Sequence, residues 1–152
     1  MQLLNNYSNR ELNIWAELIL DILVSIYFFP KIFPLIIDGQ LYSDALVGII
    51  ATSIIISIIY SIFVFGAINT LTKREEKDER DYIYELNSYR ISNIISQVSI
   101  YLLISLIVFN PINQVRFGEF TAPMIAMLLL IITLLSSTGK SLTQLFNDRK
   151  NI

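Results

Sequence analysis

The stretch from Ala45 to Leu71 contains no charged residue. A helix of about 20 residues crosses the hydrocarbon core of a bilayer, so this stretch is long enough to span a membrane. Its apolar residues would cover all sides of a helix, whereas membrane β-strands alternate apolar and polar positions. The stretch therefore predicts a transmembrane α-helix.

Three more apolar runs accompany it, and prolines separate or open them: Pro30 and Pro34, then Asn110-Pro111, then Pro123. Apolar residues make up 54% of the 152-residue chain and charged residues 16%, against roughly a quarter in soluble domains. We predict an all-α integral membrane four-helix bundle that forms one domain over residues 1–152. The expected spans are about 14–33, 45–71, 91–109 and 123–138, with a charged helical loop at 72–90 and an amphipathic tail at 139–152.

Basic residues predict the orientation of these spans. All but two of them fall on one side, and short cytoplasmic loops are the ones enriched in Lys and Arg. We therefore expect both termini and the 72–90 loop in the cytoplasm, in a multi-pass protein of the inner (plasma) membrane. The majority side holds Arg10, Lys73, Arg74, Lys77, Arg80, Arg90, Lys140, Arg149 and Lys150, and the other side holds Lys31 and Arg116.

The chain has neither cysteine nor histidine. Disulfides, thiolate nucleophiles, Cys-based metal sites and His-dependent triads are therefore excluded. An intramembrane aspartyl dyad needs two embedded Asp residues, and only Asp21 lies within a predicted span. No phosphate-binding loop, dinucleotide fingerprint or nucleic-acid module is present. We expect no enzyme activity, catalytic residue, cofactor, metal or nucleic-acid partner.

Two acidic residues in the first span form the most informative pair. Glu17 and Asp21 are four residues apart and share one helix face. A carboxylate facing lipid costs about 2.5 kcal/mol or more, so the deeper Asp21 should face the bundle interior or be protonated, whereas Glu17 is shallow enough to reach water. One interpretation is a proton or cation site, and the other is an internal ion pair that fixes helix register. The expected intramembrane polar cluster comprises Glu17, Asp21, Arg90, Asn93, Gln97 and Lys140.

The 72–90 loop is the densest charged segment, and its signs alternate closely. It could be a solvated helix with internal salt bridges, a protein or oligomer contact, or a divalent-cation site. Because Arg80 lies among the acids, a cation cage is the weakest of these. The charged motif comprises Lys77, Asp78, Glu79, Arg80, Asp81 and Glu85.

This motif, with Ile83, Glu85-Leu86 and Arg90-Ile91-Ser92 after it, resembles a family of small bacterial and archaeal membrane proteins. Those proteins have four predicted spans and a Lys-Asp-Glu-Arg-Asp motif before the third helix. The family is classified as a domain of unknown function. The ending Lys140 to Leu145 is similar to the family's tail. The resemblance implies a four-span fold, and genes for helix-turn-helix regulators beside those of the family would suggest membrane sensing or immunity. Tyr82, Asn87 and Tyr89 depart from the family's more basic pattern.

These features favour a non-enzymatic membrane protein that forms homo-oligomers, with a dimer preferred. It would present the 72–90 segment to a cytoplasmic protein partner in sensing or regulation. Small residues in the second span, Ser53, Ser57 and Ser61, favour close helix packing. The alternatives are a small transporter or channel that uses Glu17 and Asp21, and an immunity or defence membrane protein.

Overall fold

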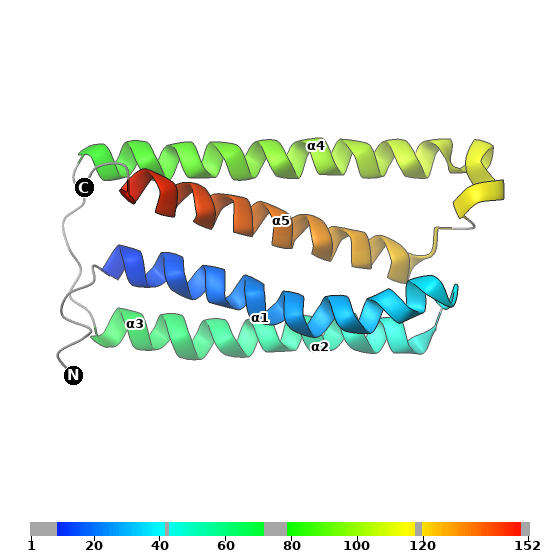
Figure 1. Cartoon of the computed structure of the whole chain (residues 1–152), viewed down its shortest axis with the longest axis horizontal. Helices are drawn as coiled ribbons and strands as arrows, with labels where there is room; N and C mark the ends of the chain where they lie inside the picture. Colours follow the sequence, from blue (N-terminus) through cyan, green and yellow to red (C-terminus); the bar gives the residue numbers. More distant parts are fainter. Residues whose placement is uncertain (1–8, 42, 72–78, 118–119, 150–152) are drawn as a thin grey trace.

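A computed structural model describes residues 9–41, 43–71, 79–117 and 120–149, which are helical apart from short connections (Figure 1). The second apolar stretch is one continuous rod in which a π-helical turn joins two α-helical parts. The elements are α1 (Asn9–Ile37), α2 (Asp44–Tyr60), the π-helix η2 (Ser61–Phe65), α3 (Gly66–Leu71), α4 (Glu79–Phe117) and α5 (Ala122–Arg149).

Four helical stretches are long and apolar enough to cross a membrane. They are Asn9–Ile37, Asp44–Leu71, Tyr82–Phe109 and Ala122–Asn147. The described residues contain no strand. For the described residues, the prediction of an all-α fold with four candidate spans is confirmed, and four such helices are typical of a multi-pass membrane protein.

The first span is longer than predicted, because α1 continues through Pro30 and Pro34 to Ile37. The expected break at these prolines is wrong. Each proline removes one backbone donor but leaves its own carbonyl free, and the Pro34 carbonyl accepts a hydrogen bond from Asp38 N at 2.9 Å. The chain reverses just afterwards at Gly39, whose φ of 66° is favourable for glycine.

The helices of the second half are also longer than predicted. α4 begins at Glu79, well before the expected span start at Ile91, and continues through Pro111 to Phe117. Figure 1 shows the ribbon of α4 bending sharply near its end, as a proline inside a helix favours. Residues 139–149 are the last turns of α5 rather than a separate surface helix.

The helices lie in the order α4, α5, α1, α2 across the molecule (Figure 1). α1 packs against both α2 and α5, whereas α4 packs against α5 and against no other described element. The starts of α1 and α4 and the ends of α3 and α5 lie at the same end of the bundle, which we call the Asn9 end. α4 is therefore a peripheral helix held by one neighbour.

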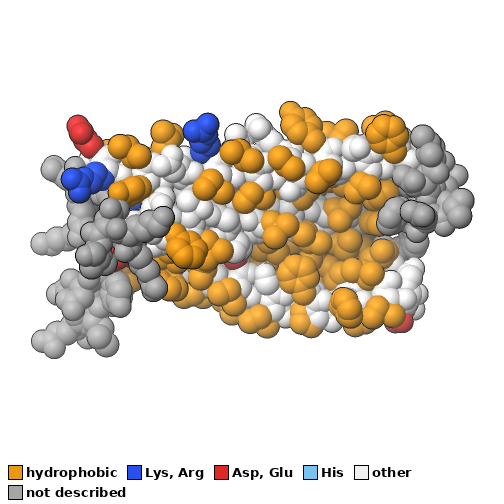
Figure 2. Space-filling view, turned by 45° about the horizontal axis from the view of Figure 1, so that its top comes forward, with side chains coloured by type: hydrophobic (Ala, Val, Ile, Leu, Met, Phe, Trp, Pro, Cys, Tyr) orange, Lys and Arg blue, Asp and Glu red, His pale blue; other side chains and the backbone are white. Residues whose placement is uncertain are grey.

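The interior is apolar toward the other end, where α1 meets α2 and α5. Its buried core cluster consists of Phe28, Ile32, Leu46, Ile50 and Met127. Outside this core the helices expose many large apolar side chains, which cover much of the face in Figure 2. Exposed apolar surface on this scale is costly in water and favourable in lipid.

The small residues of α2 serve packing and local backbone bonding. Ser53 is fully buried, and its hydroxyl donates to Ile49 O at 2.9 Å, while Ser57 donates to Ser53 O at 2.9 Å. At the end of α2, Tyr60 OH donates to Ala16 O at 3.0 Å and links the start of the π-helical turn to α1. Ser61 opens that π-helical turn.

Candidate functional site

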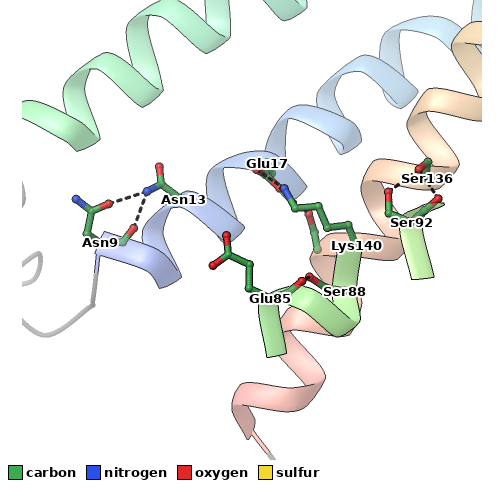
Figure 3. Close-up of polar contacts among 9 residues, drawn as sticks. Asn9, Asn13, Glu17, Glu85, Ser88, Ser92, Ser136 and Lys140 are labelled. Carbon is green, nitrogen blue, oxygen red and sulfur yellow. Dashed lines mark hydrogen bonds and ion pairs between the residues drawn. The ribbon is translucent and has the colours of Figure 1, made fainter. Parts of the chain in front are cut away.

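A polar cluster lies between α1 and α5 in the half of the bundle near the Asn9 end (Figure 3). Lys140 Nζ donates to both carboxylate oxygens of Glu17 at 2.9 Å, so the ion pair is bidentate. The side chains are 16% and 29% exposed, respectively. Residues far apart in the chain are thus joined by charge-assisted hydrogen bonds at the edge of the apolar region.

Asp21 lies one helical turn further along α1 and is only 6% exposed. Thr138 Oγ1 lies 3.3 Å from Asp21 Oδ2, within donor distance, and Ser137 offers a second hydroxyl. Thr138 also has a backbone acceptor, Leu134 O, at 2.8 Å, so its single proton is shared between two acceptors. Hydroxyl groups, rather than a cation at ion-pair distance, are the direct partners of Asp21.

The cluster also joins α4 to the other helices. The ammonium of Lys140 lies 4.8 Å from the centre of the Tyr89 ring, which is a cation–π contact. Ser141 Oγ lies 3.4 Å from Glu17 Oε2, so one turn of α5 contacts α1 and α4 together. Lys140 is therefore the residue at which the three helices meet.

A second polar contact, between serines, connects α4 and α5 one turn away (Figure 3). Ser136 donates to Ser92 O at 3.0 Å, and its hydroxyl accepts from Ser96 at 2.8 Å. The Ser92 and Ser136 hydroxyls are 2.7 Å apart. Short side chains with internally satisfied hydroxyls let two membrane helices approach closely.

Gly139 lies on α5 where the Ile95 side chain of α4 packs directly against its backbone. A Cβ added at Gly139 would lie 2.5 Å from Ile95 Cδ1, well inside van der Waals contact. Any larger residue at this position would force the Ile95 side chain or α4 itself to shift.

The structure brings together three of the six residues predicted for the intramembrane cluster: Glu17, Asp21 and Lys140. It does not bring the other three there. Arg90, Asn93 and Gln97 lie on α4 with exposed side chains. Their positions along α4 are close to the level of the Glu17–Lys140 pair. Their side chains, however, are on the side of α4 that is turned away from α5.

The predicted charged motif is only partly within the described residues. Lys77 and Asp78 lie outside them, whereas Glu79 and Arg80 are exposed at the start of α4. Asp81 belongs to the first turn of α4, and Glu85 is half-buried and accepts a hydrogen bond from Ser88 Oγ through its backbone carbonyl. In the described part of the chain, no three acidic side chains converge on a possible metal position.

Sequence reasoning missed several members of the polar interior. Ser88, Ser141 and Gln144 are buried, and Tyr89 contacts Lys140. A signal was available, because Ser88, Ser92 and Ser96 recur every four residues and so share a helix face. The same holds for Ser137 and Ser141 on α5. Serine is common in this chain, however, and spacing alone does not identify the facing helix.

The chain matches no family model, no curated protein and no solved structure. The resemblance to the four-span family with the charged motif therefore stays a prediction.

Chemically, the cluster combines one balanced ion pair with one further carboxyl group. The pair holds α1 to α5 at a fixed register, because both oxygens of Glu17 are engaged by the same ammonium. Such a site can stabilise the fold, and Asp21 beside it is the group that could exchange a proton or bind a cation.

Proposed function

We propose that this chain is a non-enzymatic membrane protein that acts by association, pairing with copies of itself and presenting the charged segment at 72–90 to a cytoplasmic protein. The observation that supports this proposal most strongly is the position of α4. Among the described elements it packs against α5 alone, and the side chains of Arg90, Asn93 and Gln97 on α4 are exposed.

The polar interior supports the same proposal. A transport site must release its ligand, whereas Glu17 is bound bidentately by Lys140 and the pair is shielded by Ser141 and Tyr89. Removing one member of such a pair leaves an uncompensated charge and destabilises the fold. The pair is therefore better suited to holding α1 against α5 than to exchanging a ligand. The association would serve sensing or regulation at the membrane, or, as a further alternative, defence of the membrane.

The proposed orientation places both termini and the start of α4 in the cytoplasm. Its support is the basic residues at the Asn9 end, where Arg10, Arg80 and Lys140 lie, while the opposite turn carries Asp38 and Asp44.

Cysteine labelling tests this orientation, since the chain has no native cysteine. We expect a membrane-impermeant maleimide to label Gln40→Cys, in the exposed turn after α1, in intact cells. Arg80→Cys, exposed at the start of α4, should be labelled only after the membrane is broken. If Arg80→Cys were labelled in intact cells and Gln40→Cys were not, the proposal that the 72–90 segment contacts a cytoplasmic protein would be wrong.

A transporter or channel is the second candidate, and burial of Asp21 against hydroxyl groups is the observation that favours it. The test is ion or proton flux into liposomes that contain the purified protein. Under the association proposal, wild type and Asp21→Asn should both be indistinguishable from empty liposomes. Flux that disappears in Asp21→Asn but persists in Asp38→Asn, which changes an exposed acid, would instead establish the transporter.

A further inference from the structure

The outer face of α4 carries polar side chains where a lipid-facing helix should be apolar. Arg90, Asn93, Gln97 and Tyr101 follow one another at steps of three and four residues, so they form one stripe. All four side chains are exposed, and Tyr101 is 68% exposed. We call these four residues the α4 stripe.

The stripe lies on the side of α4 away from the face that packs on α5: Arg90, Gln97 and Tyr101 are roughly opposite that face, and Asn93 is on its flank, about 100° from Ser92. That packed face includes Ser88, Ser92 and Leu103, of which Ser88 and Leu103 are buried. Residues two apart on a helix differ by about 200° in direction, so Arg90 points away from the face that carries Ser88 and Ser92. Since α4 has no other described neighbour, the bundle itself does not cover the stripe.

Two members of the stripe, Asn93 and Gln97, are amides within the candidate span Tyr82–Phe109. Gln97 lies about 12 Å along the helix from Tyr89, the level of the Glu17–Lys140 pair, at ~1.5 Å per residue. Among the described residues, neither Asn93 nor Gln97 has a side-chain hydrogen-bond partner. Burying an amide in hydrocarbon without hydrogen-bond partners costs several kcal/mol. We therefore expect the partners of these two amides to come from outside this chain's fold.

We propose that the α4 stripe is the interface through which two copies of this chain pair in the bilayer, α4 against α4, with Asn93 and Gln97 hydrogen-bonding across the contact. This inference rests on the self-association proposed above and names the surface that performs it.

The chemistry of the amide group favours a second copy over another partner. Each amide carries both donors and an acceptor, so it is complementary to its own kind. Two copies with the same orientation are related by a two-fold axis along the membrane normal, which brings each residue to its mate at the same depth. Asn93 therefore meets Asn93, and Gln97 meets Gln97, without any change of register.

The residues around the amides suit this contact. Ile94, Val98 and Ile104 flank the stripe with half-exposed apolar side chains that can pack across the interface. Arg90 is nearest the Asn9 end, where its long side chain can turn toward headgroups and water, so the two guanidinium groups need not meet. Tyr101 continues the stripe toward the other end of the helix.

Single-cysteine crosslinking in nanodiscs tests the proposal. Native mass spectrometry of the wild type should give twice the 17.5 kDa chain mass. Asn93→Cys and Gln97→Cys should each form a disulfide-linked dimer on mild oxidation, because a disulfide needs Cα atoms roughly 4.4–6.8 Å apart. Ile55→Cys, on the exposed face of α2, should form no disulfide-linked dimer under the same oxidation, because α2 lies outside the proposed contact.

A second variant measures the contribution of the amides. Asn93→Leu combined with Gln97→Leu should weaken dimerisation in bilayers by about tenfold, as expected for loss of interhelical hydrogen bonds. Both side chains are exposed, so the monomer should fold normally. Asn69→Leu, which replaces an exposed amide on α3, is the matched control and should leave dimerisation unchanged.

The possible failures are distinguishable. A monomeric wild type would overturn this inference together with the proposed self-association. A dimer that crosslinks at Ile55→Cys but not at the α4 stripe, or that is unaffected by the double Leu variant, would overturn this inference alone. Crosslinks from Gln97→Cys to a different protein in native membranes, without a homodimer, would also overturn it.

Discussion

Replacement of Lys140 by Met is expected to lower the free energy of unfolding by about 2 kcal/mol, since it leaves the Glu17 carboxylate without its cation. Loss of one partner from a fully buried ion pair costs ~3–5 kcal/mol. The expected cost is smaller here because the Lys140 and Glu17 side chains keep 16% and 29% of their exposure. Unfolding of the purified protein by SDS in mixed micelles provides the measurement.

The Glu17→Gln variant completes a double-mutant cycle with Lys140→Met. We expect the double variant to be more stable than the sum of the two single losses predicts, because it contains no unpaired charge. Lys31→Met is the matched control: Lys31 is exposed and contacts only the Tyr27 ring at 4.0 Å among the described interactions, so its loss should change stability by less than about 0.5 kcal/mol. Strict additivity of the two single variants would contradict a structural ion pair.

The second large effect is expected at Gly139, where the Ile95 side chain of α4 packs against α5. Gly139→Leu should destabilise the protein by about 2 kcal/mol, the usual range for an overpacked contact, because its side chain would occupy the space of Ile95. It should also separate the two helices. A disulfide between Ser92→Cys and Ser136→Cys, whose hydroxyl groups are 2.7 Å apart in the native protein, should then form poorly.

Two further variants identify the cause. Ile95→Ala in the Gly139→Leu background should restore part of the stability and the Ser92–Ser136 crosslink, since it removes the colliding side chain. Gly48→Leu is the matched control, because a Cβ at Gly48 has no other atom within 4 Å. If Gly48→Leu were as damaging as Gly139→Leu, the effect would belong to the loss of glycine and not to the contact with Ile95.

Part of the site followed from the sequence and part did not. Glu17 and Asp21 were identifiable because a charge in an apolar helix must find a partner, and Lys140 was a candidate because it lies at a similar depth. Arg90, Asn93 and Gln97 satisfied the same depth argument, yet they are exposed on the far side of α4. Depth follows from position along a helix, whereas the direction of a side chain in the bundle depends on which neighbour the helix selects.

The helix ends, too, could be predicted only in part from the sequence. Pro30 and Pro34 were expected to end the first helix, but α1 continues through both. Each proline removes a single backbone hydrogen bond, and the Pro34 carbonyl still accepts one from Asp38 N. In lipid, a helical backbone with a few lost bonds is favoured over an open chain with many. Local breaker signals are therefore weaker in an apolar helix than in a soluble one.

By itself the sequence determined that this chain consists of apolar helices long enough to cross a membrane. That property depends on composition and run length, because the transfer of side chains and backbone into lipid is a sum over residues. Only the tertiary structure decided that Lys140 pairs with Glu17, that Asp21 faces hydroxyl groups, and that α4 carries its amides outward. These outcomes depend on the rotation of each helix about its own axis, which is fixed by contacts between residues more than a hundred positions apart, such as Glu17 and Lys140.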